Sequence, residues 1–102
     1  MIQIQAPRFS LGKLVATKAA LAAIREEGKT PFAFVARHAR CDWGDDLSKE
    51  DRLLNDDAVK DGSRILSAFV LTKTQERLWC LTEGEDDHGQ REATTLLLSS
   101  EY

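Results

Sequence analysis

The chain has 102 residues, of which 42% are hydrophobic and 30% charged, and its net charge is −3 at pH 7. These values exclude a wholly disordered chain and are typical of one globular domain that builds a modest core without metals or disulfides. No apolar run reaches the roughly 18 residues of a membrane span, and the first residues lack the features of a signal peptide, so we expect a single cytoplasmic domain over residues 1–102 with no membrane contact.

The first residues show strand-like patterns ahead of the helices. Residues 2–5 alternate apolar and polar side chains, and residues 13–16 fit a short edge strand. Thr17 then offers an N-cap for a helix that runs to about Glu27, because its hydroxyl can accept from a free backbone N–H.

Two more helices are predicted before residue 62. Thr30 and Pro31 begin a helix that ends near Arg40, and Ser48, followed three residues later by an acid as in a capping box, begins a third that ends near Lys60. The expected inward residues are Ala20, Leu21 and Ile24 in the first helix, Phe32, Val35, Ala36 and Ala39 in the second, and Leu54 and Ala58 in the third.

The pattern changes to strands after Gly62. Residues 64–72, 78–82 and 93–98 are rich in branched and aromatic side chains, and the charged, glycine-containing residues 83–91 between the last two runs predict a loop. We therefore predict an α+β fold with about three N-terminal helices followed by a three-stranded antiparallel meander, and with room for an added N-terminal edge strand.

Charge is segregated along the chain. Residues 1–40 carry a formal charge of +5, residues 42–61 carry −5 and residues 62–102 carry −3. Such segregation produces either two oppositely charged faces or charge pairs across the fold, and the sequence leaves both open.

The segment after the second helix holds the main candidate for a binding site. His38 near Asp42 and Asp45 can act as a general base with a raised pKa, and Trp43 can serve as a partly exposed anchor. The structural alternatives are a His38 cation at a helix C-terminus and a Trp43 that fills the junction of helix and sheet. The candidate binding residues are Arg37, His38, Asp42, Trp43, Asp45 and Asp46.

A second candidate is catalytic. Small ribonucleases place a carboxylate, a histidine and arginines on an antiparallel sheet to act on a phosphodiester, and this chain has those residue types on or beside its predicted strands. They have no signature spacing, and the acidic balance disfavours a polyanionic substrate. The residues concerned are Arg64, Ser67, Glu83, His88, Arg91, Thr94 and Thr95, with His38 as the alternative histidine.

Two further interpretations concern macromolecular partners. The acid run from Asp42 to Asp61 can imitate phosphate charge and occupy the basic channel of a nucleic-acid enzyme. Direct nucleic-acid binding would instead use the bases of the first two helices, which are Lys18, Arg25, Lys29, Arg37 and Arg40.

Cys41 and Cys80 lack zinc-site spacing, so we expect reduced thiols, no metal and no cofactor.

The run RHARCDWG at 37–44 resembles a family of short bacterial proteins encoded on plasmids and integrated mobile elements, some of them labelled as restriction-system subunits. The resemblance continues through GSRILS at 62–67, ATT at 93–95 and EY at 101–102, and two positions depart from it, with Cys41 in place of Gly and Ser99 in place of Pro. It implies a mobile-element setting and no particular mechanism.

Together these observations predict a non-enzymatic accessory protein that binds a protein partner through residues 38–61, in the manner of an anti-restriction or anti-CRISPR protein. A small hydrolase or ribonuclease and a weak nucleic-acid-binding module are the alternatives.

Overall fold

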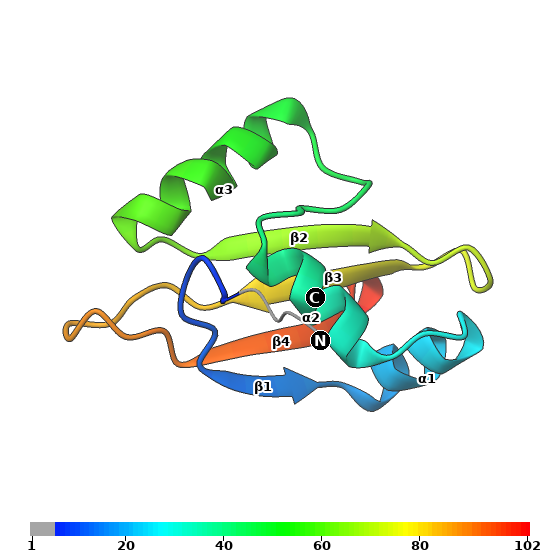
Figure 1. The fold of residues 1–102 in the computed structure, drawn as a ribbon. Coiled ribbons are helices and arrows are strands. Elements are labelled where there is room, and N and C mark those ends of the chain that lie inside the picture. Colours follow the sequence, from blue (N-terminus) through cyan, green and yellow to red (C-terminus); the bar gives the residue numbers. More distant parts are fainter. Residues whose placement is uncertain (1–5) are drawn as a thin grey trace, which may run out of the picture.

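A computed structural model describes residues 6–102, so the alternating residues 2–5 lie outside the described part. Figure 1 shows how the elements are arranged. In chain order they are β1 (Lys13–Ala16), α1 (Lys18–Glu26), α2 (Pro31–Ala39), α3 (Lys49–Asp61), β2 (Ile65–Val70), β3 (Arg77–Thr82), β4 (Ala93–Leu98) and a 3₁₀ turn, η1 (Ser99–Glu101).

The strands form one four-stranded mixed sheet in the order β1-β4-β3-β2. β2, β3 and β4 pair antiparallel, whereas β1 pairs parallel with β4. The predicted three-stranded antiparallel meander is therefore wrong, and the helices are not all N-terminal, because β1 precedes them and η1 follows the last strand. A parallel pair needs a long crossover between its strands, and here most of the chain lies between β1 and β4, so no local pattern reveals the pairing.

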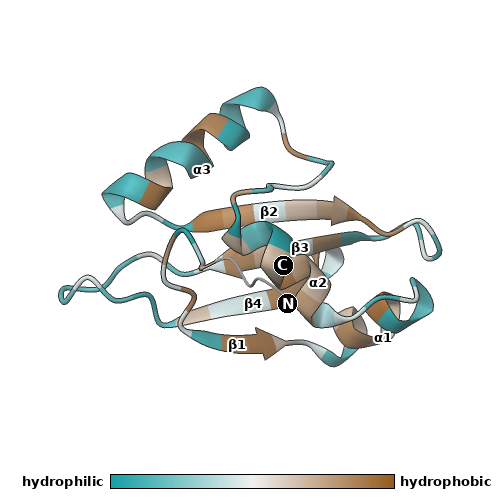
Figure 2. Ribbon diagram, in the orientation of Figure 1, coloured by the Kyte–Doolittle hydropathy of each residue, from teal (hydrophilic) through white to brown (hydrophobic). Residues whose placement is uncertain are grey.

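One face of the sheet carries the core. α2 crosses this face in Figure 1, and α1 lies at the end of β1. Apolar residues of α1 and α2, among them Ile24, Phe34 and Val35, pack with Phe69 of β2 and Leu78 of β3. Figure 2 shows the corresponding hydrophobic colouring along the strands and on part of α2.

The predicted helix ends are confirmed where they rest on a specific side chain. Thr17 Oγ1 accepts a hydrogen bond from Ala20 N at 3.0 Å, and Ser48 Oγ accepts one from Asp51 N at 3.1 Å. Gly62 ends α3 with a φ of +85°, in the left-handed region that favours glycine.

The predicted buried faces are partly wrong. Leu21, Phe32 and Leu54 were expected to face inward, but they are 38%, 72% and 64% exposed. Polar side chains take inward positions instead, His38 on α2 and Asn55 on α3. A pattern of apolar spacing cannot anticipate this, because it treats every polar residue as solvent-facing.

Candidate functional site

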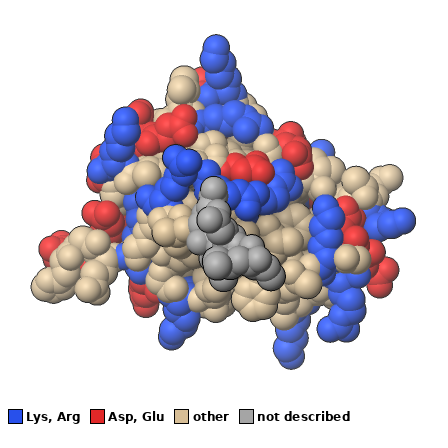
Figure 3. Space-filling model, viewed as in Figure 1, with Lys and Arg blue, Asp and Glu red and all other residues tan. Residues whose placement is uncertain are grey.

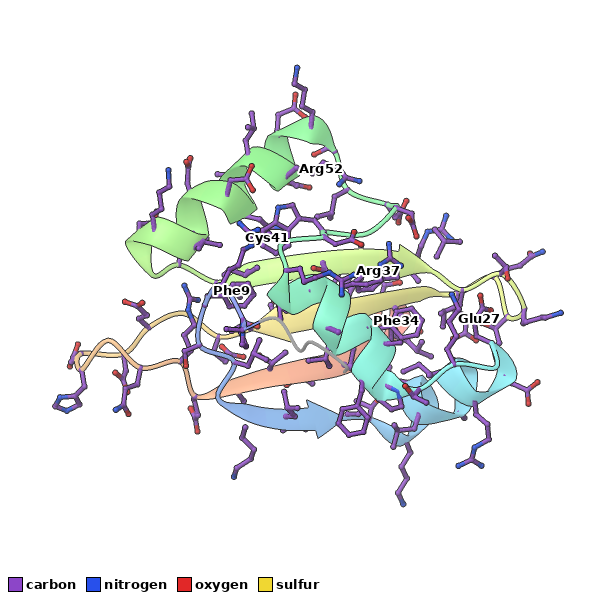
Figure 4. All side chains as sticks on the ribbon, in the orientation of Figure 1. Phe9, Glu27, Phe34, Arg37, Cys41 and Arg52 are labelled. Atoms are coloured by element: carbon purple, nitrogen blue, oxygen red, sulfur yellow. The ribbon has the colours of Figure 1, made fainter. Side chains whose placement is uncertain are left out.

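The residues after α2 form an ion-paired loop. Arg37 Nε donates to Asp42 Oδ2 at 2.7 Å, and Arg37 Nη2 lies 3.3 Å from Asp42 Oδ1 and 3.6 Å from Asp45 Oδ1. Figure 4 shows Arg37 between α2 and β2. The hydrogen bond from Arg37 lowers the pKa of Asp42, and the same bond raises the pKa of Arg37. These carboxylates are paired with a cation on the neighbouring helix.

The next acid in the run is also paired. Asp46 Oδ2 accepts from Arg77 Nε at 2.8 Å, and both side chains stay about two-fifths exposed, at 42% and 43%. Figure 3 shows positive and negative side chains interleaved over this face of the molecule. Here the segregated charges of the sequence meet as pairs, so a face of one sign does not form around this loop.

Trp43 fills the junction between α3 and the sheet. It is only 4% exposed, and its Nε1 donates to Asp56 Oδ1 of α3 at 3.0 Å. Its ring packs beside Phe9 and His38, with ring centroids 6.2 and 6.0 Å away. The prediction that Trp43 is an exposed anchor is wrong, because its ring is buried. The buried ring supports this end of the core.

The loop 43–46 covers the outer edge of β2. Ala68 N donates to Trp43 O at 3.0 Å, and Ala68 O accepts from Asp45 N and Asp46 N at 2.9 and 3.2 Å. Gly44 lies so close to β2 that a Cβ there would stand 2.0 Å from Ala68 O, and its φ is +90°. Only glycine fits this approach, which gives Gly44 of the DWG run a structural role.

Asn55 of α3 covers the neighbouring part of that edge, at Leu66. Its Nδ2 donates to Leu66 O at 2.7 Å, and its Oδ1 accepts from Leu66 N at 3.1 Å. The amide group thus pairs with a strand residue as a neighbouring strand would. This contact explains why Asn55 faces inward in place of Leu54.

His38 belongs to a buried chain of hydrogen bonds that crosses the sheet. Its Nδ1 lies 2.5 Å from Ser67 Oγ in β2, and its Nε2 lies 2.8 Å from Thr82 Oγ1 in β3. Thr82 Oγ1 is 2.7 Å from Thr94 Oγ1 in β4, which donates to Leu11 O at 2.7 Å. The chain therefore runs from β2 to the residues ahead of β1.

The final acceptor fixes the proton positions from Thr94 back to His38 Nε2. A carbonyl only accepts, so Thr94 gives its proton to Leu11, and Thr94 must then accept from Thr82. Thr82 must therefore accept from His38 Nε2–H. Of the two neutral tautomers of His38, only the one protonated on Nε2 satisfies these bonds, and its Nδ1 then accepts from Ser67 Oγ.

The electrostatics of His38 agree with that assignment. Burial, together with the nearby positive charge of Arg91, lowers the pKa of His38 to about 4. The expected rise of this pKa beside Asp42 or Asp45 is wrong, because both carboxylates bind Arg37. With no exposed surface and both ring nitrogens hydrogen-bonded, His38 is placed as a structural group and not as a general base.

Arg91 is a second buried polar group that the sequence placed among catalytic candidates. It is 4% exposed, and its guanidinium donates to Ser63 O, Glu83 O and Ala58 O at 2.7, 3.0 and 2.9 Å. Ala58 O lies in the last turn of α3, where a positive charge interacts favourably with the helix dipole. Arg91 thus fastens the end of α3 to the sheet.

The structure brings the candidates Ser67 and Thr94 together with His38, but it leaves His88, Glu83 and Arg64 apart from them. His88 is exposed in the loop before β4, where its backbone N–H donates to Asp86 Oδ1 at 2.8 Å. Glu83 is exposed, and Arg64 donates to the Tyr102 hydroxyl at 2.7 Å. Ser67 and Thr94 are committed to the buried chain of His38.

Arg25 and Lys29, the basic candidates at the end of α1, line a different surface from this loop. Arg25 and Lys29 line a depression of about 400 Å³ between α1 and α2, together with Leu21 and Pro31. Lys29 Nζ lies 5.8 Å from the centre of the Phe34 ring. Arg37, which the nucleic-acid interpretation also uses, is instead engaged by Asp42.

What remains open near the predicted site is the outer side of α3. Asn55 and Ala58 are the buried residues of this helix, whereas Leu53 and Leu54 are 55% and 64% exposed. Acidic Glu50 shares the solvent side with them. The apolar pattern of the sequence does not identify this surface, because identifying it requires knowing that Asn55 faces the sheet.

Within residues 6–102, no three His, Cys, Asp or Glu side chains are grouped to hold a metal ion, and no helix is long and apolar enough to cross a membrane. The fold and the site define a two-layer α+β domain with a polar-lined sheet edge. Comparison of the chain with family models, with curated proteins and with solved structures gives no match.

Proposed function

We propose that the chain is a non-enzymatic binding protein that docks the solvent side of α3 onto a basic surface of a partner protein. The observation that carries the proposal is the exposure of two adjacent leucines, Leu53 at 55% and Leu54 at 64%, on a helix whose inner side is already packed. Helices that bind in the groove of a partner present such apolar anchors within a polar rim.

The charges around these leucines define the chemistry of the partner. Glu50, Asp57 and Asp61 lie four residues before, three after and seven after Leu54, so they share its side of the helix. α3 itself, residues 49–61, carries five acids against three bases, a formal charge of −2. A surface of this sign is steered toward basic surfaces, and nucleic-acid-binding channels are extended surfaces of that kind.

The sequence resemblance supports a biological setting for this activity. An acidic surface can compete with nucleic acid for the basic channel of a host nucleic-acid enzyme without any catalytic step. We accordingly propose a counter-defence role, of the anti-restriction or anti-CRISPR kind, with Leu53 and Leu54 replacing Trp43 as the anchors.

The test uses the chain as bait in lysate of its native host, with bound proteins identified by mass. We expect a stoichiometric partner that added duplex DNA displaces. Leu54→Lys should weaken capture by about tenfold or more, as loss of a central anchor does, while Leu21→Lys on α1 should not. Equal capture by the Leu54→Lys variant, or capture of nucleic acid alone, would overturn the proposal.

The contribution of charge is tested separately from the anchors. Glu50→Lys combined with Asp57→Lys should weaken capture and flatten its dependence on salt, because steering charges lose their effect as salt screens them. The matched control is Glu83→Lys combined with Asp87→Lys, which makes the same change of charge at exposed positions outside α3.

A further inference from the structure

The outer edge of β1 is open in the described part of the chain. β1 has only β4 as a neighbour, and no strand of residues 6–102 lies on its other side. Lys13 N donates to Glu92 O and Thr17 N donates to Leu96 O, each at 3.0 Å. Because backbone groups alternate in direction along a strand, the N–H and C=O of Leu14 and Ala16 point outward.

The side chains along this edge are also apolar and exposed. Leu14 is 47% exposed and Val15 is 43% exposed, and Phe32 at the start of α2 is 72% exposed. Leu14, Ala16 and Phe32 help to line a hollow of about 160 Å³ beside the strand. An open strand edge with apolar flanks is a template for a further strand.

We propose that β1 pairs antiparallel with β1 of a second copy of this chain, which joins the two sheets across a twofold axis at Val15. This dimer is independent of the α3 surface, because α3 lies beyond β2 at the opposite edge of the sheet (Figure 1). It would present two α3 surfaces, one at each end of a continuous sheet.

The directions of the backbone groups select the register. In an antiparallel pair, each hydrogen-bonded residue places both its N–H and its C=O toward the partner. Leu14 opposite Ala16 of the second copy uses all of the outward groups of both strands. A shift that pairs Ala16 with Gly12 fails, because Gly12 has a φ of +65° and is not extended.

This register is self-complementary in charge, which is why a second copy fits better than an unrelated strand. It places Lys13 opposite Thr17 of the partner, and Thr17 Oγ1 donates a hydrogen bond to Glu101 Oε1 at 2.8 Å. The Lys13 ammonium of each copy thus comes beside the Glu101 carboxylate of the other. A twofold interface repeats each contact, so this pair forms twice.

Apolar contacts follow from the same register. Val15 faces Val15 of the second copy on the axis, in a pair without hydrogen bonds where side chains approach most closely. On the other face, Leu14 of the second copy lies next to Ala16, beside the hollow that Phe32 lines. The dimer therefore covers Leu14, Val15 and Phe32, the apolar residues that α1 and α2 leave exposed at this edge.

Sedimentation velocity of the full chain, from low micromolar to about 0.5 mM, tests this dimer in a range suited to a small interface. We expect a shift from monomer to dimer mass. Val15→Lys should keep the chain monomeric, because like charges then oppose each other on the axis. Leu21→Lys, at an exposed leucine away from the edge, should dimerise as wild type does.

A crosslink reads the register directly. Val15→Cys should give a disulfide-linked dimer on mild oxidation, because non-hydrogen-bonded partners stand about 4.5 Å apart at Cα, within disulfide range. Leu14→Cys, of similar exposure but opposite Ala16, is the matched control and should crosslink far less. A wild-type chain that is monomeric throughout, or equal crosslinking of the two variants, would overturn the proposal.

Charge provides the last check. Lys13→Glu should weaken the dimer by placing a carboxylate beside Glu101 of the partner, whereas Lys60→Glu, the same change on α3, should not. Val15→Lys should still bind a partner through α3, so failure of the dimer and failure of the proposed function are distinguishable.

Discussion

The two edges of the sheet are built in opposite ways. At the β2 edge, the outward groups of Leu66 are bonded by the side chain of Asn55, and those of Ala68 by the loop 43–46. At the β1 edge, the outward groups of Leu14 and Ala16 meet no strand within residues 6–102. Natural sheets usually protect both edges against further pairing, so the contrast marks β1 as the edge left available.

This contrast also changes the interpretation of residues 38–61, which the sequence predicts to be a binding region. Gly44 and Asn55 act as a cover for β2, and Trp43 fills the space beneath that cover. The residues that look most like a site are therefore those that close one edge. The surfaces that we propose for partners are instead the solvent side of α3 and the edge of β1.

The same substitution at the two edges should give the largest difference. Ala68→Pro removes the N–H that bonds Trp43 O and inserts a ring at a position only 1% exposed, so we expect a loss of about 3–5 kcal/mol in the free energy of unfolding. Ala16→Pro removes an outward N–H without a strand partner and should cost about 1 kcal/mol or less. Urea unfolding of monomeric protein measures both, and equal losses would mean that the β1 edge is covered as well.

The buried chain of His38 supports both edges, and acid should weaken it. His38 has a pKa of about 4 in the fold and about 6.5 when unfolded. Above pH 6.5 both states are neutral there. Between pH 6.5 and 4 the unfolded state binds the proton first, so stability should fall as pH falls, by about 3 kcal/mol in all.

Unfolding measured across that pH range tests this expectation against a matched histidine. His88→Gln should leave the slope unchanged, since His88 is exposed, whereas His38→Gln should lower stability at neutral pH and flatten the slope. A His38→Gln variant with the wild-type slope would show that His38 is not the group that titrates.

Asn55 should contribute somewhat less to the free energy of unfolding than the buried row of hydrogen bonds around His38. Asn55→Leu keeps the branched shape but leaves both Leu66 groups without partners, and we expect a loss of about 2–3 kcal/mol in the free energy of unfolding. Asp57→Leu, on the exposed side of the same helix, is the control and should change stability by less than about 0.5 kcal/mol. If the two variants lose the same amount, the amide is not what holds α3 on β2.

The sequence predicts those parts of the fold that depend on neighbours in the chain. The caps at Thr17 and Ser48 depend on one side chain and the backbone within a turn, and both are found. The parallel pairing of β1 with β4 depends on residues some eighty positions apart, for example Lys13 with Ala93, and no local pattern encodes it.

The errors at the candidate site share a physical cause. Asn55 and His38 are polar, so their spacing counts as solvent-facing, yet each satisfies its polar atoms inside the fold. Phe32 shares a side of α2 with buried Val35 and Ala39, but it lies in the first turn, beside β1, and stays 72% exposed. Recognising an inward Asn or His beforehand requires knowing which strand groups need a partner. The misplaced apolar residues Phe32 and Leu54 thus lie on the two surfaces that we propose for binding.

The smallest expected effect concerns the ion pair that overlies the β2 edge. Asp46 and Arg77 are both about two-fifths exposed, so a double-mutant cycle with Asp46→Asn and Arg77→Gln should give a coupling of about 0.5 kcal/mol that fades in salt. A coupling this small means that the backbone bonds of Ala68, and not the charges, hold the loop in place. A coupling well above about 1 kcal/mol would make the ion pair of Asp46 with Arg77 part of the cover of β2.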